Sequence, residues 1–197
     1  KLKPSNHTGG IDTIRPSKTN NKFVFYNQAD PRWGSNPMGN KTLKEAGCGP
    51  TSLAMAISQL TGEKITPDTV AELGKEHLPG FSSVSLFPSV ANKLKMNYAE
   101  ADSKNRRFIT DKLRQGLPVM LSGRSISKGS PYTPEGHVVT ASHLSGNKVY
   151  IQDPRGENYS RYYPLSSVLT GLNKGMIVTP SSATNVEKLS SGTIGDV

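Results

Sequence analysis

The sequence predicts an α+β fold, with helices in the first half of the chain and an antiparallel sheet in the second half. Two observations lead to this prediction. Up to about residue 115, apolar residues recur three and four positions apart, which is the spacing of a buried helix face. From residue 117 on, short apolar and β-branched runs are separated by turn residues such as Ser145-Gly146-Asn147-Lys148. Helices followed by strands indicate an α+β arrangement.

Four helices are expected. The first follows Cys48-Gly49-Pro50, where Pro50 fixes a helical φ in the first turn, and it continues from Thr51 to Leu60. The second starts at Thr66-Pro67-Asp68 and carries Val70, Leu73 and His77 along one side. The other two are expected over residues 85–95 and 109–115, and Gly116 ends the last of them.

The strands follow from short apolar runs. We expect one strand at 117–122, a hairpin formed by 138–141 and 149–152, and a late strand at 176–178. A further short strand is expected at Phe23-Val24-Phe25-Tyr26. The Gly- and Ser-containing run 122–136, with Arg124, Lys128 and Tyr132, is expected to form a flexible wall over a cleft.

Cys48 is the only cysteine, and its setting favours a nucleophile. The glycines on both sides let the backbone turn sharply and leave room for a substrate. At a helix N-terminus, the dipole and the backbone N–H groups favour thiolate and lower the thiol pKa. The alternative is a small buried hydrophobic residue, which free cysteine often is.

A nucleophilic cysteine needs a base, and His137 is the best candidate among four histidines. His7 and His77 are most simply solvated, and His143, six positions after His137, could point to the same strand face. His137 follows Gly136 and opens the first strand of the hairpin, whereas Asp153 ends the second. Antiparallel pairing places these two ends side by side, so that Asp153 can accept a hydrogen bond from the imidazole.

These residues carry a family resemblance. The segments 26–33 (Tyr-Asn-Gln-Ala-Asp-Pro-Arg-Trp), 47–55 (Gly-Cys-Gly-Pro-Thr-Ser-Leu-Ala-Met), 136–139 (Gly-His-Val-Val) and 149–154 (Val-Tyr-Ile-Gln-Asp-Pro) resemble the papain-like cysteine peptidases related to the double-glycine leader peptidases of bacteriocin exporters. The chain is most similar to the secreted, free-standing branch of that group, common in Gram-positive bacteria and their phages. The resemblance covers about residues 23–180 and implies a papain-like fold, with the helix that carries the nucleophile packed on the sheet that carries the base.

The resemblance also implies a role for each matched residue. Cys48 would be the nucleophile, His137 the general base and acid, and Asp153 the residue that orients His137. Gln28 would donate its side-chain amide to the oxyanion, which needs donors placed before reaction. The exporter peptidases place this glutamine only a few residues before the cysteine, whereas here twenty positions separate the two. This spacing resembles the free-standing branch and argues against the processing of bacteriocin leaders.

Substrate contacts are expected at four further residues. Two of them lack a side chain that would obstruct a substrate, and two are aromatic residues of the matched motif or the expected wall: Gly47, Gly136, Trp33 and Tyr132.

Composition predicts one domain with two polar extensions. The folded part is expected over 23–180, after a polar basic leader or linker at 1–22 and before a Ser/Thr/Gly-rich extension at 181–197. Because the chain lacks an initial methionine, a signal-peptide run and a transmembrane stretch, we expect a domain of a longer protein or a mature product. The single cysteine excludes a disulfide framework, and we expect no metal or cofactor.

The formal net charge is +9, and residues 23–180 alone carry +6 of it. An anionic cell-wall polymer therefore fits as a partner of a secreted or envelope-associated protein. No aromatic and basic motif supports a nucleic acid partner.

Three functions remain open from the sequence. The first is a thiol hydrolase that cleaves peptide or amide bonds in cell-wall peptides or extracellular polypeptides. The second is a peptidoglycan amidase or transpeptidase that uses the same residues. The third, an inactive binding module of papain-like shape, is disfavoured because a nucleophile, a base, an orienting group and an oxyanion donor are all present.

Overall fold

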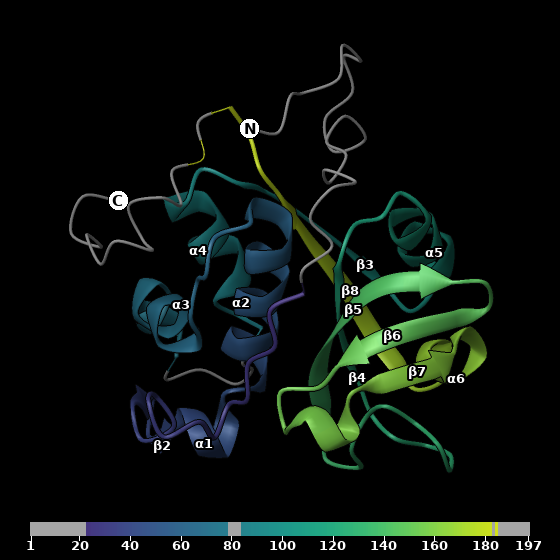
Figure 1. Ribbon diagram of the computed structural model, residues 1–197, viewed down its shortest axis with the longest axis horizontal. Helices are drawn as coiled ribbons and strands as arrows, with labels where there is room; N and C mark the ends of the chain where they lie inside the picture. The colour runs from purple at the N-terminus through teal and green to yellow at the C-terminus, as the bar shows by residue number, and fades with distance from the viewer. Residues whose placement is uncertain (1–22, 79–83, 183, 185–197) are drawn as a thin grey trace.

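The structure, a computed structural model, describes residues 23–78, 84–182 and 184. One half of the described fold is helical and the other is a sheet that also has helices on its face away from that half, as Figure 1 shows. The expected leader at 1–22 and nearly all of the expected extension at 181–197 lie outside the described residues. None of the helices in the described part is long and apolar enough to cross a membrane.

The helical half contains a central helix and its neighbours. A small hairpin of β1 (Pro37–Met38) and β2 (Lys41–Thr42) leads into α1 (Leu43–Ala46). The central helix α2 (Cys48–Thr61) is buried along nearly its whole length and ends at Gly62, whose φ is +76°. Around it lie α3 (Pro67–Leu73), the 3-10 turn η2 (Lys75–His77) and α4 (Phe87–Lys93). His77 therefore does not continue the face of α3 as expected, because the helix ends before Gly74.

The other half is a six-stranded antiparallel sheet of order β3-β8-β4-β5-β6-β7. Its strands and the elements between them are, in chain order, β3 (Asn97–Asp102), α5 (Arg106–Arg114), β4 (Val119–Gly123), β5 (His137–Ser145), β6 (Lys148–Gln152), η3 (Glu157–Tyr159), β7 (Arg161–Pro164), α6 (Leu165–Leu169) and β8 (Leu172–Thr179). The β5–β6 hairpin has its turn where the sequence predicts it.

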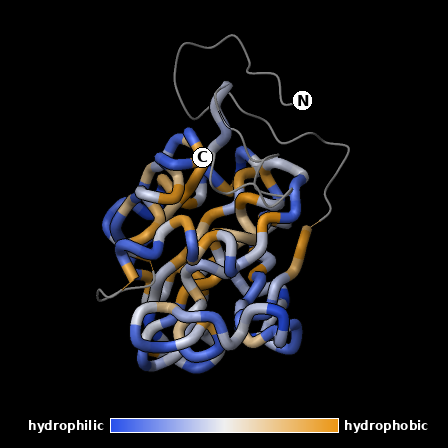
Figure 2. Tube along the Cα trace, turned by 90° about the vertical axis from the view of Figure 1, so that its left-hand side faces the viewer, coloured by the Kyte–Doolittle hydropathy of each residue, from blue (hydrophilic) through white to orange (hydrophobic). Residues whose placement is uncertain are grey.

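Each face of the sheet has its own core, which side-chain alternation explains. In β4, Met120 packs in the core with α2, α3 and α4, while its neighbours Val119 and Leu121 pack in the core with α5 and α6. In β8, Met176 packs in the core with α2, α3 and α4, and Ile177 packs in the core with α5 and α6. Apolar segments gather inside the fold and hydrophilic loops lie at its rim (Figure 2). The sheet is thus a middle layer between two layers of helices.

Two expectations about irregular segments need correction. Residues 23–26 form no strand; they run as an extended segment across α2 and β6, where Nε2 of Gln152 donates to the carbonyl of Val24 over 3.1 Å. The run 122–136 is anchored rather than free. Tyr132 is 4% exposed, and its hydroxyl donates to the carbonyl of Val168 over 2.6 Å.

Candidate active site

Cys48 is the first residue of α2, and the backbone before it leaves no alternative to glycine. A Cβ on Gly47, the N-cap, would collide with the carbonyl oxygen of Leu43 in α1. Because α1 ends at this tight junction, α2 starts with the half-buried thiol of Cys48 at its N-terminus. The backbone N–H groups of a first helical turn have no partner inside the helix and present partial positive charge there.

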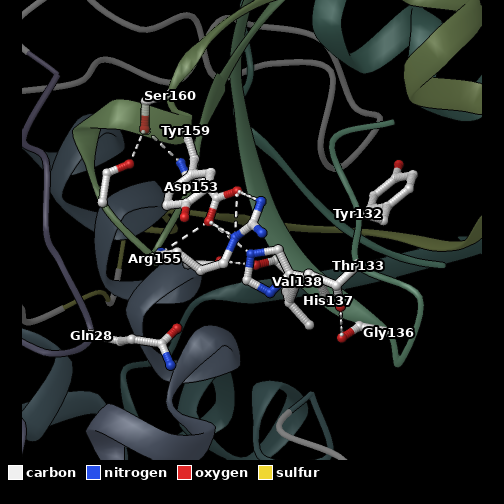
Figure 3. Close-up of polar contacts among 12 residues, drawn as sticks. Gln28, Tyr132, Thr133, Gly136, His137, Val138, Asp153, Arg155, Tyr159 and Ser160 are labelled. Atoms are coloured by element: carbon white, nitrogen blue, oxygen red, sulfur yellow. Dashed lines mark hydrogen bonds and ion pairs between the residues drawn. The ribbon is translucent and has the colours of Figure 1, made fainter. Parts of the chain in front are cut away.

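His137 lies between Cys48 and Asp153. Its Nε2 is 2.7 Å from Oδ1 of Asp153, and its ring also hydrogen-bonds the thiol of Cys48. Since Nε2 faces the carboxylate, Nδ1 is the nitrogen left for the thiol. His137 is 7% exposed and Asp153 is fully buried. Figure 3 shows the imidazole pointing at the carboxylate.

The hairpin brings His137 and Asp153 together as the sequence predicts, although they do not pair directly. In the β5–β6 register Thr140 lies opposite Gln152, so continuing it places Asp153 opposite Val139. The contact between Asp153 and His137 is therefore diagonal, which is within reach of a long side chain. Gly136, whose φ is +106°, turns the chain into the strand immediately before His137.

The two side chains change each other's protonation. Burial alone would lower the pKa of His137, but the hydrogen bonds to Asp153 and Cys48 and the charges of these groups outweigh it and raise the pKa to about 9. Burial likewise opposes ionisation of Asp153, yet its bonds to His137 and Arg155 keep the pKa of the carboxyl below its ordinary value. At neutral pH this arrangement favours an imidazolium beside a carboxylate.

Gln28 is bound to this cluster by a backbone hydrogen bond, and a second hydrogen bond orients its side-chain amide. Its backbone N–H donates to the carbonyl of Pro154 over 2.8 Å, directly after Asp153. Its Nε2 donates to the carbonyl of Lys44 in α1 over 2.9 Å, which fixes the amide with its nitrogen toward the segment before Cys48. The residues between Gln28 and Cys48 form the β1–β2 hairpin and α1, and Lys44 of α1 brings the chain back to Gln28 before α2 begins.

Comparison with known proteins places the chain in a family. The sequence profile described as the Peptidase_C39-like family matches residues 20–171. The chain belongs to this family. It is thus a cysteine peptidase with a papain-like fold. No curated protein matches the sequence of this C39-like peptidase.

Three solved structures share the fold of this C39-like peptidase. A C39-like peptidase from Bacillus anthracis is 15% identical, with a TM-score of 0.57 over 82% of this chain and 97% of that one. The peptidase domain of Streptococcus ComA, a bifunctional ABC transporter of a quorum-sensing pathway, is 17% identical, with a TM-score of 0.53 over 70% and 93%. A double-glycine motif protease from an AMS/PCAT transporter, solved with its leader peptide, is 14% identical, with a TM-score of 0.53 over 85% and 98%.

The two aromatic residues expected at the substrate are buried and have structural contacts in this C39-like peptidase. Trp33 is 2% exposed, and its indole N–H donates to the carbonyl of Asn27 over 2.9 Å. It therefore shapes the loop that carries Gln28. Tyr132 packs against Gly123, and a Cβ there would meet its ring at 2.8 Å. Gly47 and Gly136 directly precede Cys48 and His137 in the chain, and their contact with a substrate stays a prediction.

His143 does not share the environment of His137. A register shift between Ala141 and His143 breaks the alternation along β5, so the even spacing no longer implies a common face. The His143 ring stacks on Phe23 with centroids 4.8 Å apart, and its Nε2 lies 2.8 Å from the hydroxyl of Tyr162. Burial lowers the pKa of His143.

The sequence argument missed Arg155, which bonds the same carboxylate as His137. Its Nη2 donates to Oδ2 of Asp153 over 2.8 Å, and its backbone N–H donates to Oδ1 over 2.9 Å. The sequence does contain an indication of this contact, because in Asp153-Pro154-Arg155 a guanidinium follows the carboxylate by two residues. In the sequence alone, however, an arginine before Gly156 is an ordinary solvated loop residue.

Proposed function

We propose that this C39-like cysteine peptidase cleaves peptide or amide bonds through a Cys48–His137–Asp153 triad and an acyl-enzyme. The observation that carries the proposal is the position of His137, which bonds the Asp153 carboxylate at 2.7 Å and also the Cys48 thiol. A thiol at a helix N-terminus next to an imidazole has the two features that activate a cysteine nucleophile.

In the acylation step, the Cys48 thiolate attacks the carbonyl carbon of the scissile bond and forms a C–S bond. The carbonyl π electrons move to its oxygen. When the tetrahedral intermediate collapses, the C–N bond breaks and the His137 imidazolium gives its proton to the leaving amine. His137 is then neutral and takes a proton from water, whose oxygen attacks the thioester carbon. The C–S bond breaks, the electron pair returns to the sulfur of Cys48 as thiolate, and the acid product is released.

Gln28 is proposed as a donor to the oxyanion. Nε2 carries two hydrogens, and the bond to the carbonyl of Lys44 uses one of them. The other can meet the developing negative charge together with the backbone N–H of Cys48, so that both donors are in place before reaction.

The proposed substrate is a peptide, in the cell wall or in extracellular polypeptides. The double-glycine motif protease with the same fold was solved with a leader peptide, which supports a peptide as the ligand class. The net charge of +9 supports a location at an anionic surface such as a Gram-positive wall, with a wall polymer as a further partner. The second candidate, an amidase or transpeptidase, uses the same residues with a different bond or with an amine in place of water.

Mass spectrometry of products tests this proposal. The protein is incubated with purified wall, with short wall peptides and with a denatured protein, and Cys48→Ala is the matched control. We expect new peptide termini only with the native thiol; products with an added amine would identify a transpeptidase. We also expect iodoacetamide to alkylate Cys48 much faster than free cysteine at neutral pH. Identical products from Cys48→Ala, or alkylation at the rate of free cysteine, would overturn the proposal.

A further inference from the structure

The carboxylate of Asp153 is shared between two cationic side chains. His137 approaches Oδ1 alone, at 2.7 Å, whereas the guanidinium of Arg155 lies side-on to both oxygens. Nε of Arg155 is 3.2 Å from Oδ1 and 3.2 Å from Oδ2, and Nη2 is 2.8 Å from Oδ2. Asp153 is fully buried, so its carboxylate is shielded from water. Its hydrogen bonds come from the side chains of His137 and Arg155 and from the backbone N–H of Arg155. Figure 3 shows the guanidinium and the imidazole converging on it.

Arg155 is itself held in place. Its guanidinium carbon lies 4.1 Å from the ring centroid of Tyr159, which supports it on one side. Two hydrogen bonds close the turn that contains Arg155 and Tyr159. The backbone N–H of Asp153 donates to Oγ of Ser160, and the backbone N–H of Gly156 donates to the carbonyl of Asp153. The side-on pairing is therefore a feature of the whole turn from 153 to 160.

This geometry has two consequences for the carboxylate. A bidentate guanidinium fixes the plane of a carboxylate, because two parallel bonds leave no rotation about its axis. The plane so fixed presents Oδ1 to Nε2 of His137. In addition, one negative charge now faces two positive ones, so each cation is held less strongly than it would be alone.

We propose that Arg155 is a positioning residue of the peptidase, which acts on His137 through the Asp153 carboxylate by sharing it and taking up part of its negative charge. The inference rests on the proposed triad. Proton transfer to the leaving amine is most efficient when the acid does not hold its proton too tightly. By sharing Asp153, Arg155 weakens the hold of the carboxylate on the imidazolium proton.

Other ionisable groups near His137 stay constant in the test. Cys48 of α2 and Asp153, directly after β6, act on the imidazole itself. Arg124, directly after β4, lies beside Gly136, and Glu135 comes two residues before His137 in the chain. Arg124 lies next to Gly136 and is unchanged in every variant, so its charge is a background common to all of them.

The test is an NMR titration of the His137 ring nitrogens in four proteins. The native pKa is expected at about 9. In Arg155→Gln one nearby positive charge is lost, so the imidazolium is stabilised and the pKa of His137 should rise by roughly 0.5–1 pH unit. Arg155→Lys keeps the charge and should remain near the native value. Arg161→Gln is the matched control, because its guanidinium also lies over a tyrosine ring, that of Tyr163, at 4.9 Å.

The outcomes separate the two proposals. An unchanged or lowered pKa of His137 in Arg155→Gln, or an equal rise in Arg161→Gln, overturns the role of Arg155 while the triad stands. A native His137 that titrates near its ordinary pKa, with Cys48 alkylated no faster than free cysteine, overturns the triad itself. If Arg155→Gln does not fold, Tyr159→Leu replaces it, because removing the supporting ring should shift the pKa in the same direction by less.

Discussion

A histidine that is 7% exposed would ordinarily be neutral at pH 7, since burial penalises the charged ring. At His137 the buried carboxylate of Asp153 reverses this preference. The sequence could predict this pair because a glycine-led histidine and an Asp-Pro turn stand at matching ends of one hairpin. It could not predict Arg155, because only the folded turn shows which carboxylate the guanidinium reaches.

At Gln28, the proposed role predicts a loss of turnover without a loss of thiol reactivity. The oxyanion exists mainly in the transition state, so Gln28→Ala should lower kcat by about 10²–10³-fold with little change in KM. Alkylation of Cys48 forms no oxyanion and should proceed at nearly the native rate. Steady-state kinetics measures kcat and KM, and iodoacetamide labelling measures the reactivity of the Cys48 thiol. Loss of both, together with a lower Tm, would mean that Gln28 only supports the fold.

The two histidines of β5 give a second residue-level prediction. His137→Ala should abolish peptidase activity, since no other imidazole contacts Asp153 among the described residues. His143→Ala should keep most of it, because His143 packs with Phe23 and Tyr162. Product formation measured by mass spectrometry compares the two variants. Activity retained by His137→Ala but lost in His143→Ala would contradict the proposed base.

Among the elements, those with a strong apolar pattern were predictable and those with a weak one were not. The sequence predicts α2 and the β5–β6 hairpin because their apolar residues are buried at clear helical or strand spacing. It misses β3 (Asn97–Asp102), whose pattern is mostly polar and half-exposed, and β7 (Arg161–Pro164), where two of the four residues are charged or proline. It misses α6 because five residues are too few for a periodicity.

A substitution at Tyr132 tests whether the run 122–136 has a structural role rather than a role in substrate binding. Tyr132→Phe removes the buried hydrogen bond to the carbonyl of Val168 and leaves that acceptor without its partner, so the free energy of unfolding should fall by about 1–2 kcal/mol. Because the ring is buried in the core behind the sheet, KM should not change. Denaturant unfolding and steady-state kinetics measure these effects. An increased KM at native stability would restore Tyr132 as a substrate contact.

For the whole molecule, the candidate site lies where three parts of the chain meet. The helical layer contributes Cys48, the sheet contributes His137 and Asp153, and the segment before the first hairpin contributes Gln28. Each part is predictable by itself, but the distances between them depend on how the layers pack. Gln28 shows this best, since its link to the carbonyls of Pro154 and Lys44 joins the sheet to the helical layer.

The free energy of unfolding of the whole molecule should depend on pH, and above neutral pH the titration of His137 should make the largest contribution to this dependence. Its folded pKa of about 9 exceeds its ordinary value of 6.5, so its contribution is fully present below pH 6.5 and is lost as the pH rises through about 9. Asp153 and His143 have lowered folded pKa values, so their contributions are lost as the pH falls instead. Urea unfolding between pH 6 and pH 10 should show the free energy of unfolding of the native protein declining, while His137→Gln declines less over the same range. Parallel curves for the two proteins would mean that His137 is not held as an imidazolium in the folded state.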